Sequence, residues 1–307
     1  MPRTVPGYGD HVEHRRVDEG RGGVGVRIRS YLHEAHTFDV LDGGPIEGPA
    51  VVLLHGFPER ASHWDAVSAV LHREGLRTLA PDQRGYSPGA RPRGRWHYRM
   101  PCLVGDTVTL IEQYGAPVHL VGHDWGAAVA WATAAARPDL VRTLTTVSVP
   151  HPAAFVRSLV TSTQALRSWY VLAFQPPGIA ELMARTMPGL LRGALAASGL
   201  TDAEVGRVWE EMVESGALPG ALGWYRALPL SFGTSFGTSP RPVVVPTTHV
   251  WSDGDTALAR RGAELTEAYV DAPYRLRVLQ GVSHWVPLHA PQLLAEVIID
   301  RVTHAEG

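Results

Sequence analysis

The sequence predicts an α/β fold, a mostly parallel sheet flanked by helices with a helical segment inserted late in the chain. First, segments with strand and helix patterns alternate at the spacing of βαβ units. Second, residues 50–54 (AVVLL) form a continuous β-branched apolar run, as expected of a strand buried on both faces. Third, this alternation stops near residue 150 and resumes near residue 240.

The elements follow from the apolar patterns in chain order. Residues 26–32 (VRIRSYL) alternate apolar and polar side chains, which predicts a half-exposed strand near a sheet edge. The buried strand at 50–54 comes next. Further strands are predicted at 76–80, 118–121, 144–149, 247–251 and 274–279. Helices are predicted between them at 61–73, 100–114, 125–137, 257–269 and 290–304.

The interruption predicts the domain organisation. Residues 150–240 lack a buried strand pattern and contain helical stretches separated by Pro-Pro-Gly, Met-Pro-Gly and Leu-Pro-Gly. We therefore expect a core built from residues 1–149 and 241–307, with residues 150–240 as an inserted helical lid. Such an insertion can cover the carboxyl ends of the strands, where ligands bind in open α/β sheets. The first twenty residues are predicted to be a poorly ordered lead-in.

Composition excludes several classes of protein. The chain has 307 residues, a net charge of -2, 45% hydrophobic and 19% charged residues, so it suits a globular protein and gives no electrostatic case for nucleic acid or an anionic membrane. All 28 basic residues are arginines, so Schiff-base and lysine general-base chemistry are excluded. Asparagine is absent as well.

The remaining composition indicates a cytoplasmic enzyme without a metal. The single cysteine, Cys102, forbids an internal disulfide. No secretory signal is visible at the N-terminus, and the longest mostly apolar run, 127–136, is far short of the ~20 residues that span a bilayer. No pair of histidines at helical ligand spacing is joined by a carboxylate, so no metal site is predicted.

The strongest motif is Gly-His-Asp-Trp-Gly at 122–126, between a predicted buried strand and an alanine-rich helix. It has the shape of a nucleophile elbow, with Asp124 in place of the usual serine. Flanking glycines suit a tight strand-to-helix turn, and the start of the helix favours a carboxylate. The alternative is an ordinary turn in which Asp124 caps the helix.

Three further motifs supply partners for Asp124. His-Gly-Phe-Pro at 55–58 follows the central strand, so the backbone N–H groups of Phe57 and Trp125 could form an oxyanion hole, unless this is a plain turn. Trp-Ser-Asp-Gly-Asp at 251–255 offers two carboxylates, and His284 follows the last strand. The chain order of nucleophile, acid and histidine is that of α/β-hydrolases.

With these motifs, the chain resembles the soluble epoxide hydrolases of the α/β-hydrolase fold from about residue 24 to residue 302. The matching motifs are HGFP at 55–58, DQRGYS at 82–87, GHDWG at 122–126, SVPHP at 148–152 and GVSHW at 281–285. The resemblance implies that Asp255 orients His284, by the W-x-x-x-D spacing, and that Asp253 turns the loop. It also implies catalytic lid tyrosines at Tyr170 and Tyr225, each of which could instead be a packing aromatic.

The resemblance further implies a mechanism and a pocket. Asp124 would attack the epoxide while Tyr170 and Tyr225 bind its oxygen, and His284 would activate the water that hydrolyses the ester. No cofactor is required, and the partners are a small epoxide and water, with the protein a monomer or a homodimer. The expected substrate-binding residues are Phe57, Trp125, His151, Trp169, Phe174 and Trp285.

Two rival functions stay open. A haloalkane dehalogenase uses the same aspartate and histidine, but a common form holds the halide with an asparagine where this chain has Phe57. One that relies on a second tryptophan stays open, because Trp169 and Trp224 lie in the predicted lid. Fluoroacetate dehalogenases place an arginine after the nucleophile, where this chain has Trp125. A non-catalytic small-molecule receptor on the same fold is the other rival.

Overall fold

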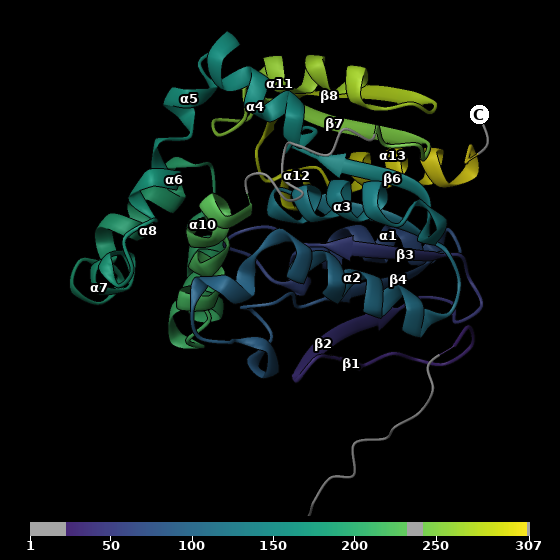
Figure 1. Ribbon diagram of the computed structural model, residues 1–307, viewed down its shortest axis with the longest axis horizontal. Helices are drawn as coiled ribbons and strands as arrows, with labels where there is room; N and C mark the ends of the chain where they lie inside the picture. The colour runs from purple at the N-terminus through teal and green to yellow at the C-terminus, as the bar shows by residue number, and fades with distance from the viewer. Residues whose placement is uncertain (1–22, 232–241, 306–307) are drawn as a thin grey trace, which may run out of the picture.

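The computed structural model describes residues 23–231 and 242–305, and its centre is an eight-stranded sheet (Figure 1). The strand order is β1-β2-β4-β3-β5-β6-β7-β8. Strands β3 to β8 run parallel to one another, whereas β1 pairs antiparallel with β2 and β2 pairs antiparallel with β4 at the edge of the sheet. The strands are β1 (Ser30–His33), β2 (His36–Gly43), β3 (Ala50–Leu54), β4 (Arg77–Pro81), β5 (Val118–His123), β6 (Val141–Val147), β7 (Thr247–Gly254) and β8 (Tyr274–Ser283).

Helices cover both faces of the sheet. On one face, α1 (Asp65–Arg73) and α13 (Pro291–Thr303) share an apolar cluster that includes Trp64, Leu71 and Leu294. On the other face, α2 (Met100–Tyr114) and α3 (Trp125–Ala136) belong to a larger cluster around Trp131. The two short helices α11 (Arg260–Leu265) and α12 (Val286–His289) follow β7 and β8. The predicted α/β class, with a mostly parallel sheet and helices on both faces, is confirmed.

Between β6 and β7 the described chain is helical, and these helices lie together beyond one end of the sheet (Figure 1). They are α4 (Pro152–Thr161), α5 (Gln164–Arg167), α6 (Trp169–Ala173), α7 (Ile179–Thr186), α8 (Pro188–Ala197), α9 (Asp202–Trp209), a π-helical turn (Glu210–Glu214) and α10 (Leu218–Ser231). Short 3₁₀ turns elsewhere are Ala61–Trp64, Pro88–Ala90, Arg95–Tyr98, Pro138–Leu140 and Thr266–Tyr269. The predicted end of the insertion and the N-terminal lead-in lie outside the described residues.

Three predicted elements need correction. The first strand begins at Ser30 rather than residue 26, and β2 was not predicted although Phe38 and Val40 alternate with exposed neighbours in the pattern of a half-buried strand. Strand β6 ends at Val147 because Ser148 adopts a positive φ of 67°. The helix predicted from 257 begins only at Arg260, since the preceding backbone bonds to Asp255 instead.

Within the described residues, none of the helices has both the length and the apolar character that crossing a membrane requires.

Candidate active site

Asp124 lies on a strained turn between β5 and α3. Its backbone has φ 49° and ψ −120°, which an L-residue rarely adopts. The turn depends on its glycines, because a Cβ on Gly122 would collide with the carbonyl of Gly126, and one on Gly126 would collide with the carbonyl of Leu54. The strand, the turn and the helix are therefore packed backbone against backbone, and the Asp124 side chain projects at the carboxyl end of the sheet.

Two backbone donors hold the Asp124 carboxylate. The N–H of Phe57 donates to Asp124 Oδ2 at 2.9 Å, and the N–H of Trp125 also bonds to this carboxylate. A Cβ on Gly56 would lie 2.5 Å from the Asp124 Cβ, so only glycine lets this loop approach. Burial raises the Asp124 pKa, although the charge of His284 and the two N–H donors oppose that rise. The structure thus places the backbone N–H groups of both Phe57 and Trp125 against the Asp124 carboxylate.

His284 lies between two carboxylates. Its Nδ1 is 2.8 Å from Asp255 Oδ2, and its Nε2 is 3.9 Å from Asp124 Oδ1. The other oxygen of Asp255 accepts 2.8 Å hydrogen bonds from the N–H groups of Ala257 and Leu258, which fix the orientation of the carboxylate. The Asp255 carboxylate can therefore hold one imidazole tautomer, with Nε2 directed at Asp124.

The second carboxylate of the loop is not part of this arrangement. Asp253 Oδ1 accepts a hydrogen bond from the N–H of Gly281 at 2.7 Å, and its side chain is exposed. Of the two aspartates that the sequence offered, the structure brings Asp255 to His284, whereas Asp253, near the end of β7, bonds to the backbone of β8 at Gly281.

Burial and the charges of this group shift its pKa values. Burial opposes a charged imidazole, but attraction from Asp255, the hydrogen bond to it and the charge of Asp124 together raise the pKa of His284 to about 9. Burial alone would raise the pKa of Asp255, but His284 and the two backbone donors lower it below its ordinary value. The neighbouring carboxylates therefore favour the imidazolium form of His284 in the free protein.

Two tyrosines from the inserted helices face the Asp124 turn. Tyr170 belongs to α6 and Tyr225 to α10, and their ring centroids are 6.1 Å apart. The Tyr225 ring packs edge-on against Trp125 at 5.0 Å, and the Trp125 side chain donates a hydrogen bond to the Tyr225 hydroxyl. Burial and then the charge of Asp124 raise the pKa of Tyr170; burial, Tyr170 and Asp124 raise that of Tyr225. Both phenols therefore keep their protons beside the carboxylate.

Among the other predicted pocket residues, two lie in this group. The Phe174 ring contacts Phe57, Tyr170 and Tyr225, with centroids 5.1 to 6.0 Å apart. The Trp285 ring packs edge-on against His284 at 5.0 Å, and its indole N–H donates to the backbone carbonyl of Ser198.

The remaining two predicted pocket residues do not join them. Trp169 is 68% exposed on the outside of α6. His151 caps α4 by accepting a hydrogen bond from Ala153 N, and its ring packs against Tyr269 and Trp131. These contacts favour a structural role for His151, because its ring caps a helix, stacks on Tyr269 and packs edge-on against Trp131.

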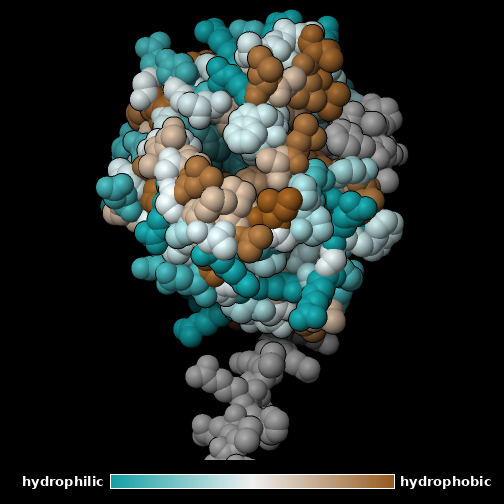
Figure 2. All heavy atoms as spheres, turned by 90° about the vertical axis from the view of Figure 1, so that its left-hand side faces the viewer, coloured by the Kyte–Doolittle hydropathy of each residue, from teal (hydrophilic) through white to brown (hydrophobic). Residues whose placement is uncertain are grey.

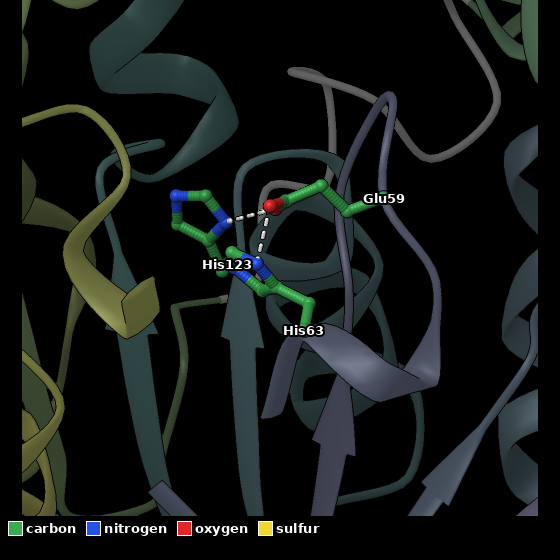
Figure 3. Close-up of side chains that lie close together, drawn as sticks. All are labelled: Glu59, His63 and His123. Carbon is green, nitrogen blue, oxygen red and sulfur yellow. Dashed lines mark ion pairs between the residues drawn. The ribbon is translucent and has the colours of Figure 1, made fainter. Parts of the chain in front are cut away.

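A buried group behind His284 was missed by sequence reasoning. The Glu59 carboxyl points at His63 and His123 (Figure 3), and all three side chains are at most 2% exposed. Glu59 contacts His63 Nδ1 directly and lies 3.9 Å from His123 Nδ1, while His123 Nε2 bonds to the carbonyl of His284 at 3.0 Å. The available signals were the four-residue spacing of Glu59 and His63 and the position of His123 beside Asp124.

The charge state of this group follows from burial. Burial raises the pKa of Glu59 to about 8 and lowers those of His63 and His123 well below their ordinary values. Carboxylate and imidazole side chains can bind metals, and within the described residues the possible ligand atoms of these three lie within 4.8 Å of one another. Burial thus favours the uncharged form of each of the three side chains, a protonated carboxyl for Glu59 and neutral imidazoles for the two histidines.

We therefore expect the free energy of unfolding of Glu59→Gln to exceed that of the wild type by an amount that grows as the pH rises. The unfolded chain releases the Glu59 proton near 4.5 and the folded chain near 8, so the wild type loses stability between these values. The relative gain should reach the order of a few kcal/mol near pH 8, as urea unfolding at several pH values can measure. The exposed Glu210→Gln is the control, and parallel curves for wild type and Glu59→Gln would contradict the raised pKa.

Comparisons with known proteins agree with this geometry. Residues 51–297 match the model of the alpha/beta hydrolase family. The AB hydrolase superfamily protein YfhM of Bacillus subtilis is 34% identical over 90% of this chain and 98% of its own length. Epoxide hydrolase A of Mycobacterium tuberculosis is 30% identical over 92% and 96%. Among solved structures, epoxide hydrolase A of Mycobacterium thermoresistibile has a TM-score of 0.79 at 26% identity, over 90% of this chain and 98% of that one.

Proposed function

Because the chain belongs to the alpha/beta hydrolase family and its relatives include epoxide hydrolases, we propose that it hydrolyses an epoxide to a vicinal diol. The observation that carries this proposal is the pair of protonated phenols, Tyr170 and Tyr225, beside the Asp124 carboxylate. Ring opening creates an alkoxide, which needs hydrogen-bond donors and a proton. The helices that hold these phenols act as the lid of the site, with the proposed lid spanning residues 150–240.

In the first step, an oxygen of Asp124 attacks one epoxide carbon and forms an ester. The C–O bond of the ring breaks, and its electron pair stays on the epoxide oxygen between Tyr170 and Tyr225. A phenol proton passes to that oxygen. The raised phenol pKa values support this role, because both side chains hold their protons until the alkoxide forms.

In the second step, His284 Nε2 takes a proton from a water that attacks the ester carbonyl. The oxyanion is stabilised by the N–H groups of Phe57 and Trp125, which contact the Asp124 carboxylate already. The tetrahedral intermediate then collapses, and the diol leaves with the proton from His284. The proton left on the Asp124 carboxyl returns to the phenolate formed in the first step, which restores both the carboxylate and the tyrosine. Asp255 orients the neutral imidazole and stabilises the imidazolium that forms when the proton is taken.

This sequence predicts a characteristic pH dependence of ester hydrolysis. The charge of Asp124 contributes to the His284 pKa of about 9, and esterification removes that charge. The pKa of His284 should therefore be lower in the ester, by roughly one unit. Because the neutral imidazole is the base, the rate constant of ester decay should rise with pH through this lowered value.

Single-turnover stopped-flow fluorescence over a range of pH values measures the decay rate directly. The control is an NMR titration of His284 in the free protein, which should report the higher value. A decay rate that falls as pH rises, or one that titrates at the same pH as the free protein, would contradict the assignment.

The structure weakens the dehalogenase alternative that relies on a second tryptophan. The indole N–H of Trp224 donates to the carbonyl of Arg84 at 2.7 Å, and Trp169 lies on the surface. Trp285 donates to Ser198. These three indoles are thus committed elsewhere or exposed to solvent, so none is placed to hold a departing halide beside Asp124.

The proposed function is tested by incubating the purified protein with a panel of epoxides and, separately, haloalkanes. We expect diol from at least one epoxide and no halide release above the level of an Asp124→Ala control. Halide release without diol formation would replace the proposal with a dehalogenase.

A further inference from the structure

The outer surface of the inserted helices is unusually apolar. Of the seventeen large hydrophobic side chains that are exposed in the described residues, nine lie in the short stretch 152–197. We call this set the outer apolar face: Val156, Val160, Leu166, Trp169, Leu172, Ile179, Leu182, Met187 and Leu190. Figure 2 views the side of the molecule on which α5 to α8 lie and shows apolar side chains gathered around a hollow.

The helices of this face have their amphipathicity reversed. Surface helices ordinarily bury their large apolar side chains and expose polar ones. On α7, however, Ala180 and Ala184 are buried while Ile179 and Leu182 are exposed. Similarly, α4 buries Ser158 and exposes Val156 and Val160. On both helices, small residues pack inward and large apolar residues point to solvent. The exposure of apolar side chains is therefore shared by more than one helix.

Positive charge accompanies these apolar side chains. The stretch 152–197 contains the arginines Arg157, Arg167, Arg185 and Arg192 and one acidic residue, Glu181. Glu181 is already paired with Arg226 at 2.7 Å. The net charge of −2 for the whole chain averages over this local excess of arginine.

We propose that the outer apolar face docks on an anionic lipid surface. Exposed tryptophan and leucine side chains can bury themselves at the boundary between headgroups and acyl chains. Three of the arginines, Arg157, Arg185 and Arg192, are exposed and can bind anionic headgroups, whereas Arg167 donates to the backbone carbonyl of Asp255. A second copy of the chain fits less well, because a symmetric contact would bring the same arginines face to face. The protein lies on such a surface and does not cross it.

Co-sedimentation with lipid vesicles tests the proposal independently of catalysis. The full-length protein is spun with vesicles of phosphatidylcholine alone, or with an equal share of phosphatidylglycerol. We expect binding to the anionic vesicles, several-fold weaker binding to the neutral ones, and release when NaCl is raised from about 0.05 to about 0.5 M.

A matched pair of variants locates the binding surface. Leu166→Ser, Trp169→Ser and Leu172→Ser together should lower the partition coefficient about tenfold or more. The control combines Leu32→Ser, Trp96→Ser and Leu293→Ser, which are also exposed but lie on other parts of the surface, and should bind like the wild type. Circular dichroism confirms that both variants are folded.

The outcomes separate the occupants of this face. Equal binding by the two variants, or no binding to anionic vesicles, would overturn the proposal. Light scattering on the lipid-free protein tests the alternative occupant. If the wild type is a dimer that does not bind vesicles, and only the variant at residues 166, 169 and 172 is a monomer, the face binds a second copy of the chain and the proposal is wrong.

Discussion

A His284→Gln variant should accumulate a covalent ester on Asp124 and lose about 10³-fold in steady-state turnover. The first step needs only the nucleophile and the phenols, whereas the second needs a base for water, a contribution of about 10² to 10⁴ in rate. The Nε2 atom of His284 is 3.9 Å from Asp124, so its loss leaves the ester without a base. Intact-protein mass spectrometry should show an increase equal to the mass of one epoxide.

The control for this experiment is the double variant Asp124→Ala and His284→Gln, which should show no increase in mass. A peptide map should place the added mass on the peptide that contains Asp124. Adducts from haloalkanes alone would assign the site to a dehalogenase. The absence of any adduct, with the variant folded, would favour a receptor that binds without reacting.

Removing both lid phenols should have a comparable effect on the first step. Tyr170→Phe and Tyr225→Phe each take one donor from the developing alkoxide, and one such donor contributes about 10² to 10³ in rate. In the double variant, ester formation should fall by at least 10³-fold, because no phenol is left to supply the proton. Rapid-quench measurement of the ester separates this step from its hydrolysis.

The rate of ester hydrolysis should change little in these variants, because the phenols do not contact the hydrolytic base in the proposed mechanism. Tyr114→Phe, which removes a buried phenol on α2 far from Asp124, is the control for loss of a tyrosine hydroxyl in general. Unaltered ester formation in the double variant would rule out the two tyrosines as the acid. The melting temperatures of the variants and the wild type should be equal, which shows that a slower reaction is not caused by unfolding.

Much of the core could be predicted because its signals are local. The continuous β-branched apolar run at residues 50–54 is the pattern expected of a strand buried on both faces, and β3 is fully buried. The Asp124 turn was predicted because strand, glycines and small helical residues adjoin in the chain. Strand β2 was missed since its alternation is carried by only Phe38 and Val40, in a stretch rich in polar residues.

The sequence by itself determined the fold class, the nucleophile candidate and the motifs around it, because each rests on residues that are neighbours in the chain. The family resemblance already favoured Asp255 over Asp253, but the contact of Asp255 with His284 depends on tertiary structure, since it joins the loops that follow two strands. Tertiary structure also brought Tyr170 and Tyr225 together from two helices, enclosed Glu59 with two histidines, and turned Trp169 outward. These outcomes depend on long-range packing, which a local pattern does not contain.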